Sequence, residues 1–232
     1  MQQKAHTFTK FDDELNSIRA HILEMSELVE IQLRQSLLAL FEANTVIARQ
    51  VVDQDYSVNQ LEVLIDSLCV TAIAREQPAA SDLQSIVIAT KIVVHLERIG
   101  DEAKKIARIA ERLAQQTQLT KQRLAGVRLA AQLVQQKLAE VIDCFARLDT
   151  FTAYKLLGSE DLINEEFNVI FRDLIQSMTD DPRTITSSLE IVFVAKAIER
   201  IGSHVKHISK LVIDASNRYS AIQFTPSSTR LC

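Results

Sequence analysis

The chain has 232 residues, of which 47% are hydrophobic and 24% charged, with a formal net charge of -4 and a pI of about 5.8. This length allows one large or two small domains that each bury a core. The acidic balance argues against nucleic acid as a ligand, because phosphates require a basic face. The absence of Trp argues against aromatic platforms for bases.

The three cysteines, Cys69, Cys144 and Cys232, lie far apart and form no CxxC pair, so we expect buried or incidental thiols in a reducing compartment. The first ten residues are polar and contain no signal-peptide core. No uninterrupted apolar run approaches ~18 residues, so no membrane span is expected. These features predict a cytoplasmic protein that meets membranes only through partners.

Only 4 Gly and 3 Pro occur, which is typical of long helices, since sandwiches and barrels need many turns. Apolar residues recur at three- and four-residue steps, as in Leu15, Ile18, Ile22, Met25 and Val29. The sequence predicts six helices, at about 8–41, 45–75, 81–115, 120–148, 149–178 and 181–215.

Several predicted helices begin with a capping signal. Ser81 followed by Gln84 has the pattern of a capping box. Thr120 and Asp149 are N-cap candidates for the next two helices. Asp181 precedes a proline that suits the first helical position of the last helix.

The two halves of the chain resemble each other. Glu-Arg-Ile-Gly occurs at residues 97–100 and again at 199–202, an offset of 102 that also relates Lys104 to Lys206. Two unrelated amphipathic helices would rarely share four consecutive residues with flanking matches. The expected fold is all-α, with two tandem three-helix bundles related by an internal repeat. Its expected segments are 1–117, 118–215 and a frayed tail, 216–232.

Carboxylates gather at one level of the first predicted hairpin. Residues equally far from the turn of an antiparallel helix pair lie at the same height. A second acidic pair, Glu62 and Asp66, is offset by about 9 Å at 1.5 Å per residue and ranks second. The set at equal height is Asp55, Asn59, Glu97 and Asp101.

The second repeat places Asp161, Glu165, Glu199 and Ser203 in the same register. Each hairpin thus combines three carboxylates with one neutral oxygen side chain. Because clustered carboxylates repel one another, a cation should offset them. Oxygen ligands suit hard cations such as magnesium, calcium, manganese or ferric iron. Ion pairs to the arginine of each Glu-Arg-Ile-Gly motif, Arg98 or Arg200, are the alternative, and the residues alone leave both open.

Gly100 and Gly202 lie within predicted helices, where glycine costs about 1 kcal/mol relative to alanine. Their recurrence indicates a close approach to a neighbouring helix or to a ligand, and helix packing is the favoured interpretation.

Residues 97–107, Glu-Arg-Ile-Gly-Asp-Glu-Ala-Lys-Lys-Ile-Ala, resemble the signature of the PhoU family, as do the segments 55–66 and 75–83. The resemblance covers roughly residues 8–215. It implies tandem three-helix bundles whose acidic motifs bind metal clusters of iron, zinc, manganese, magnesium or calcium. It also implies a cytoplasmic repressor of phosphate-starvation signalling that links the ATPase of a phosphate ABC transporter to a phosphate-sensing histidine kinase, as a homodimer and not as an enzyme.

By this resemblance, the first metal site would use Asp55, Asn59, Glu97 and Asp101, and the second would use Asp161, Glu165 and Glu199. The chain departs from the family at Ser203, where the family pattern has Asp. The next residue, His204, is about 100° further around the helix and is not assigned as a ligand.

Two other functions compete with this interpretation. A di-iron carboxylate enzyme in a helical bundle would need Glu-x-x-His pairs, and the sequence contains none. A metal-free helical adaptor would use its acidic faces to dock a basic partner. The sequence has no nucleophile elbow and no phosphate-binding glycine loop, so neither hydrolysis nor nucleotide binding is expected.

Overall fold

The computed structural model describes residues 2–76, 78–115, 119–158 and 161–223, and these ranges contain helices and no strand. The predicted all-helical class is therefore confirmed. The elements are α1 (Gln2–Glu42), α2 (Thr45–Glu76), α3 (Ala80–Leu113), α4 (Leu119–Arg147), α5 (Thr150–Gly158), α6 (Asp161–Asp180), the 3-10 turn η1 (Pro182–Thr184) and α7 (Ile185–Gln223).

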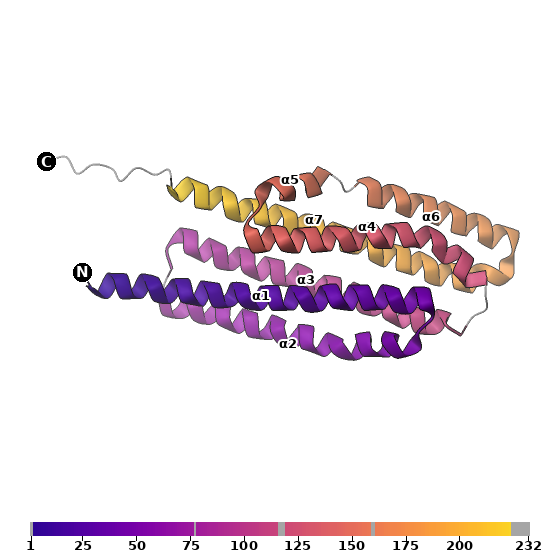
Figure 1. The fold of residues 1–232 in the computed structure, drawn as a ribbon, viewed down its shortest axis with the longest axis horizontal. Coiled ribbons are helices and arrows are strands. Elements are labelled where there is room, and N and C mark those ends of the chain that lie inside the picture. Colours follow the sequence, from indigo (N-terminus) through magenta and orange to yellow (C-terminus); the bar gives the residue numbers. More distant parts are fainter. Residues whose placement is uncertain (1, 77, 116–118, 159–160, 224–232) are drawn as a thin grey trace.

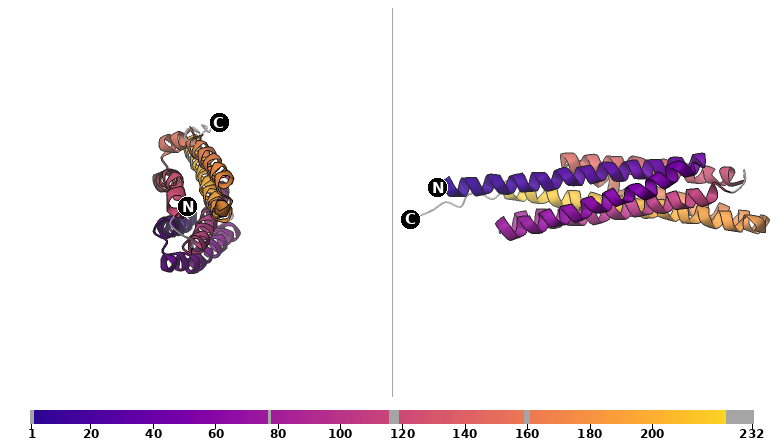
Figure 2. Two further views of the ribbon diagram at one scale, coloured as in Figure 1. Left: turned by 90° about the vertical axis from the view of Figure 1, so that its right-hand side faces the viewer. Right: turned by 90° about the horizontal axis from the view of Figure 1, so that it is seen from below.

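The helices run roughly along one axis, so the molecule is an elongated rod (Figures 1 and 2). Helices α1, α2 and α3 pack on one another, and α7 packs against α4, α5 and α6. The two bundles meet mainly along α3 and α7, and α1 also touches α4. This arrangement confirms the two-bundle prediction. It makes α3 and α7 the shared centre of the rod.

The periodic apolar stripes form the core. In α1, Ile18, Ile22, Met25, Val29 and Leu33 are at most 2% exposed. Helix α3 is buried on a wider arc because α1, α2 and α7 all contact it. Each fully buried side chain of this size contributes about 1.5–3 kcal/mol, so these stripes fix which faces of the helices turn inward.

The connections from α1 to α2 and from α4 to α5 use the same backbone device. Ala43 and Leu148 have positive φ, 54° and 55°. In both connections the amide of the following residue donates to the carbonyl five residues before it, at 3.0 Å. This is the 6→1 hydrogen bond of a Schellman motif, here built on residues other than glycine. The recurrence supports the internal repeat.

Two of the predicted N-caps are confirmed. The backbone amide of Thr152 donates to Asp149 Oδ1 at 3.2 Å. Asp181 accepts from the amide of Arg183, with Pro182 at the first helical position, although the first turn is 3-10.

The other two predicted starts are wrong by one or two residues. Helix α3 is preceded by Ala79, which has extended backbone angles and makes no side-chain cap, so Ser81 lies inside the first turn. Helix α4 begins at Leu119, which leaves Thr120 within the helix.

The predicted fifth helix, 149–178, is divided into α5 and α6. Helix α5 ends at Gly158, whose missing Cβ would meet no neighbour within 4 Å. Glycine weakens a helix by about 1 kcal/mol when no packing compensates, which explains why the helix ends there. The last helix extends further than expected, since α7 continues to Gln223 instead of ending at 215. Residues 224–232 of the predicted tail lie outside the described residues, and the predicted domain boundaries stay predictions.

Among the described residues, α2 is the one helix that is long and apolar enough to cross a membrane, and 28% of its most apolar window is buried. Its central part nevertheless carries Asp55, Glu62 and Asp66. Carboxylates at a bilayer centre cost about 2.5–3.5 kcal/mol each. The helix packs against α1 and α3, so we describe it as a bundle helix with an unusually apolar outer face.

Candidate functional site

The first acidic cluster lies between α2 and α3, as the hairpin register predicts. Asp55 on α2 is 6% exposed, and it shares a partner with Asp101 on α3. That partner is Lys104, whose Nζ lies 2.5 Å from Asp55 Oδ2 and 3.2 Å from Asp101 Oδ1. The two carboxylates are thus brought to one height and joined by an ammonium group.

The charge state of Lys104 follows from these contacts. Burial alone would lower the pKa of its ammonium group. The hydrogen bonds to Asp55 and Asp101 outweigh burial and raise the pKa above its usual value. Lys104 is therefore a permanent cation within the cluster at neutral pH.

Two glutamates complete the cluster. Burial raises the pKa of Glu97 above its usual value, and the negative charges of Asp101, Glu62 and Asp55 raise it further. Burial, Asp66 and Asp101 likewise raise the pKa of Glu62. These mutual effects indicate that the acids of α2 and α3 lie near one another. Glu62, which ranks second by height, is near enough to Asp101 for the two charges to interact.

Gln32 on α1 contacts the cluster through Asp55. It is 2% exposed, and its Nε2 lies 3.3 Å from Asp55 Oδ1 and 3.5 Å from the carbonyl oxygen of Val51. A Cβ added to Gly100 would lie 2.9 Å from Gln32 Oε1, so a larger residue would require the end of the Gln32 side chain to move. The close approach predicted for Gly100 is therefore a packing contact between α1 and α3.

Asn59, predicted to offer its side-chain oxygen as a ligand, here offers its side-chain nitrogen to Asp55. Its Nδ2 lies 3.5 Å from Asp55 Oδ2, so the amide turns its donor toward the carboxylate. Both oxygens of Asp55 thus face N–H donors from Gln32, Lys104 and Asn59. A hard cation needs several free oxygen ligands. In this arrangement three N–H donors occupy most of the acceptor sites of Asp55.

No group of three or more His, Cys, Asp or Glu side chains within the described ranges is placed to hold a metal ion. The residues predicted for the first site do come together, but an ammonium group separates two of them. The residues do not fit a metal as they are arranged here. Metal binding by Asp55, Asn59, Glu97 and Asp101 stays a prediction.

Within the side chains that the structure describes, no hydrogen bond or ion pair joins the residues of the second predicted site. The side chain of Asp161 lies outside the described residues, and Glu165 is exposed. Glu199 pairs with Lys196 one turn earlier on α7, with Nζ and Oε2 2.5 Å apart. A Cβ added to Gly202 would lie 2.9 Å from Ile163 Cδ1, which shows a close α6–α7 approach. A metal at this site also stays a prediction.

The arginines named as alternative counter-ions are placed elsewhere. Arg200 pairs across the α3–α7 contact with Glu102, at 3.3 Å. Arg98 is exposed and has only a minor lowering effect on the pKa of Glu97. The counter-ion of the first cluster is Lys104 instead. The sequence holds a signal for it, since Lys104 follows Asp101 by three residues and so lies on the same helix face.

A second cluster missing from the sequence-based prediction spans α3 and α7. His95 Nδ1 lies 3.2 Å from His204 Nδ1, and the ring of His207 stacks on that of His95 at 5.0 Å. His204 therefore faces the other bundle and not the acidic cluster, which agrees with leaving it out of the ligand set. Burial, followed by neighbouring His and Arg side chains, lowers the pKa of His95 to about 4.

The PhoU domain family matches residues 22–110 and 127–212, which is one match in each bundle. The phosphate-specific transport system accessory protein PhoU homolog of Pseudomonas putida is 39% identical over 208 residues, which are 90% of this chain and 81% of that protein. The phosphate-specific transport system accessory protein PhoU of Escherichia coli K12 is 37% identical over 208 residues, covering 89% of this chain and 85% of that protein.

The fold gives the same result. The crystal structure of PhoU from Pseudomonas aeruginosa superimposes with a TM-score of 0.86 at 39% identity, and it covers 89% of this chain and 99% of that structure. Matches of this identity and coverage, in both repeats and in three dimensions, show that the chain belongs to the PhoU family.

Proposed function

We propose that this chain is an accessory protein of a phosphate-specific transport system and that it acts by binding, not by catalysis. In this proposal it links the ATPase subunit of the phosphate ABC transporter to a phosphate-sensing histidine kinase in the cytoplasm. It thereby represses the phosphate-starvation response when phosphate is plentiful. The support comes from family membership and from relatives whose names assign them to phosphate-specific transport.

The observation that carries a binding role is the apolar outer face of α2. Tyr56, Val63 and Val70 are 68%, 69% and 67% exposed. Seven-residue steps return to nearly the same side of a helix, so these three side chains form one stripe. Exposed apolar side chains that share one side of a helix are candidates for an interaction site. This stripe offers a partner protein an apolar docking surface.

Equivalent apolar positions are exposed in both repeats. Leu83 and Val87 near the start of α3 are 39% and 40% exposed, and Ile185 and Leu189, at the offset of 102, are 43% and 44% exposed. A protein with two matching surfaces of this kind is suited to contact two partners, or a partner and a second copy of itself. This supports the adaptor role and the proposed homodimer.

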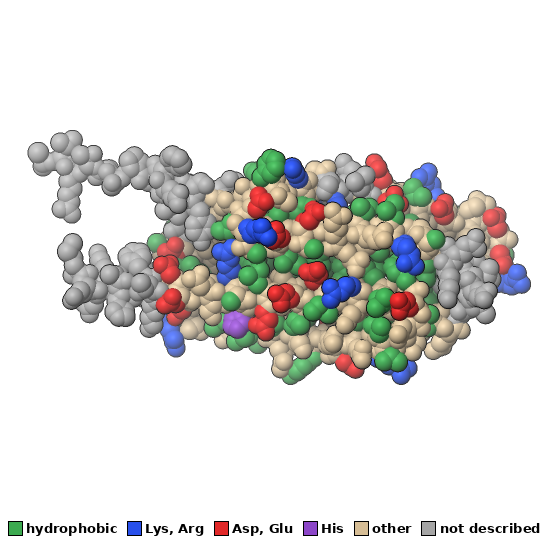
Figure 3. All heavy atoms as spheres, in the orientation of Figure 1, with side chains coloured by type: hydrophobic (Ala, Val, Ile, Leu, Met, Phe, Trp, Pro, Cys, Tyr) green, Lys and Arg blue, Asp and Glu red, His purple; other side chains and the backbone are tan. Residues whose placement is uncertain are grey.

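The alternative function, a metal-free adaptor that docks a basic partner on an acidic surface, has less support. The face formed by α1 and α4 is not acidic overall. There, acidic and basic side chains alternate with apolar ones, and neither sign of charge dominates (Figure 3).

The function is tested genetically and by capture. Deleting the gene should derepress alkaline phosphatase in phosphate-rich medium, and the wild-type gene should restore repression. The protein should also retain the transporter ATPase from a lysate. A Val63→Lys/Val70→Lys variant should lose both properties while keeping its helicity. A Gln132→Lys variant, which adds a charge at an exposed position of α4, should keep both. Normal repression in the deletion strain would refute the proposal.

A further inference from the structure

Lys104 occupies the place in the first acidic cluster where a cation is needed. Its Nζ lies within 3.2 Å of a carboxylate oxygen on each of the two helices of the hairpin. Its side chain is only 20% exposed, so it is held within the cluster and does not extend into solvent. A lysine in this position offsets the repulsion between Asp55 and Asp101, which is the main physical reason for expecting a metal between them.

The buried carboxylate of Asp55 also has hydrogen-bond donors for both oxygens without a metal ion. Asp55 Oδ1 faces Gln32 Nε2 at 3.3 Å, and Oδ2 faces both Lys104 Nζ and Asn59 Nδ2. A buried carboxylate that accepts several N–H donors has the hydrogen-bond partners that burial requires. A metal ion at Asp55 would have to displace the ammonium group and turn the Asn59 amide around.

We propose that Lys104 is a built-in counter-ion that takes the place of a metal ion, so that the first acidic cluster of this protein is held together independently of metal. The cluster is then a fixed structural ion network between α2 and α3. Gln32 connects this network to α1 through its contact with Asp55. The state of this hairpin does not depend on metal supply.

The second repeat has a lysine in the same register, since Lys206 lies at the offset of 102 from Lys104. Glu199 of the second bundle pairs instead with Lys196, one turn earlier on its own helix. The bridge between two helices is thus formed by Lys104 of the first repeat.

The test compares the full-length wild type with Lys104→Ala and with Lys105→Ala. Lys105 is the matched control, because it is the adjacent lysine and pairs with Glu102 at 2.8 Å, outside the cluster. Each protein is purified without chelator, its metal content is measured by mass spectrometry, and its thermal midpoint is recorded in EDTA, in Mg²⁺ and in Mn²⁺. Wild type should hold no stoichiometric metal and show the same midpoint in all three conditions.

Removing the lysine should create the metal dependence that it normally prevents. In EDTA the midpoint of Lys104→Ala should fall by about 5 °C or more relative to wild type. Mn²⁺ or Mg²⁺ should restore much of that loss, because the ion can then bind between Asp55 and Asp101, which have lost their counter-ion. Lys105→Ala should show neither effect.

Two results would overturn the proposal. One is stoichiometric metal in the wild type that disappears in Asp101→Asn, since the metal would then have displaced the lysine. The other is a Lys104→Ala protein as stable in EDTA as the wild type. If Lys104→Ala does not fold, Lys104→Gln replaces it, and the wild-type measurement stands without either variant.

Discussion

His95 Nδ1 of the first bundle and His204 Nδ1 of the second lie 3.2 Å apart. At this distance one Nδ1 donates its proton to the other, so the Nδ1 of at least one imidazole must be unprotonated. Arg98 and Arg200 disfavour a charge on His204, whereas Glu102 favours it. Burial is the largest cause that lowers the pKa of both His95 and His204. This part of the contact between the bundles therefore disfavours a positive charge on either ring.

Acid should therefore weaken the folded protein through His95. Its folded pKa is about 4, below the ordinary value of 6.5. Between these values the unfolded chain binds more protons than the folded one, so the free energy of unfolding falls as pH drops from 6.5 toward 4. In a His95→Gln variant, about 1 kcal/mol of this loss between pH 7 and 5 should disappear. Urea unfolding at the two pH values measures it.

His21→Gln is the control for this measurement, because His21 lies on α1, away from the contact between α3 and α7, and pairs with the exposed Glu24 at 3.2 Å. Its loss of stability between the two pH values should match that of the wild type. An equal loss in His95→Gln and wild type would show that the inter-bundle histidines do not titrate on unfolding.

Gly100→Ala should destabilise the protein by about 1–3 kcal/mol despite the better helix propensity of alanine. The new methyl group would lie 2.9 Å from Gln32 Oε1, and moving that buried side chain would break its hydrogen bond to Asp55. Chemical denaturation measures the loss.

Gly126→Ala is the matched control in α4. Its added Cβ would meet Ile170 Cγ1 at 3.6 Å, an ordinary contact. This substitution should raise the free energy of unfolding by about 0.5–1 kcal/mol, because alanine is the better helix former. If both glycine variants gained stability, the tight packing around Gly100 would be disproved.

Much of the acidic cluster was predictable because helical geometry is regular. Counting residues from the α2–α3 turn was enough to place Asp55 opposite Asp101, since rise per residue and antiparallel pairing fix relative height. The same count uses backbone positions and ignores the reach of a long side chain, so it does not show that the charges of Glu62 and Asp101 interact. It also missed Lys104, whose pairing depends on its rotamer and on competition with Arg98.

The contact between the bundles was not predictable in this way. The repeat indicates that the halves fold alike, but it contains no information on which faces they turn to each other. His95, His204 and His207 belong to different repeats, and only their packing along α3 and α7 brings them together. Gln32 is an intermediate case, because a polar residue within the apolar stripe of α1 signals a buried partner without identifying it.

Ala43→Gly should stabilise the protein by about 1 kcal/mol. Ala43 ends α1 with φ of 54°, a left-handed conformation that strains any residue with a Cβ and suits glycine. The same exchange at Ala20, an exposed position inside α1, should cost about 1 kcal/mol. Thermal unfolding of the two variants should therefore shift in opposite directions. Shifts of the same sign would contradict the assigned backbone strain.

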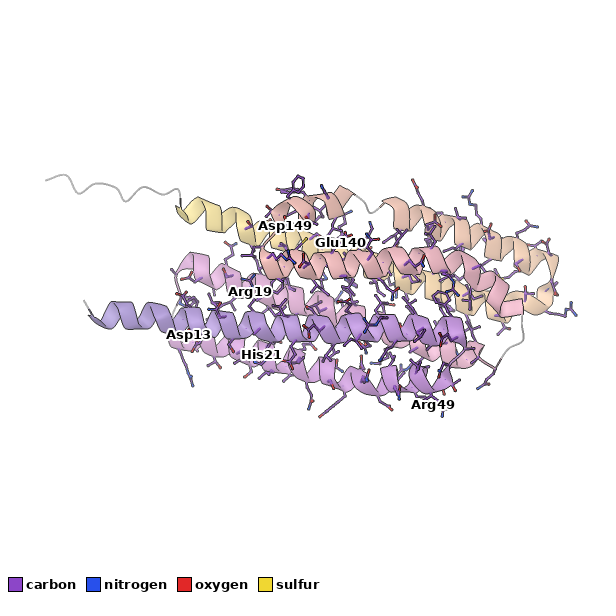
Figure 4. All side chains as sticks on the ribbon, viewed as in Figure 1. Asp13, Arg19, His21, Arg49, Glu140 and Asp149 are labelled. Carbon is purple, nitrogen blue, oxygen red and sulfur yellow. The ribbon has the colours of Figure 1, made fainter. Side chains whose placement is uncertain are left out.

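Arg19→Gln should lower the free energy of unfolding by about 1.5–3 kcal/mol, the usual value of hydrogen bonds made by a charged group. Arg19 projects from α1 toward the end of α4, just before Asp149 (Figure 4). Its Nη2 donates to the carbonyl oxygens of Phe145 and Ala146, at 3.1 Å and 2.6 Å. These carbonyls belong to the last turn of α4, where a cation also complements the helix dipole.

Because Arg19 belongs to the first bundle and α4 to the second, its loss should loosen the two bundles from each other as well as fray α4. Hydrogen exchange should accordingly increase in the last turn of α4 and in the facing part of α1. Arg34→Gln removes the same charge from an exposed position of the same helix and should change neither stability nor exchange by a comparable amount. If the two variants lost equal stability, Arg19 would contribute no more than a surface charge to the contact between the two bundles.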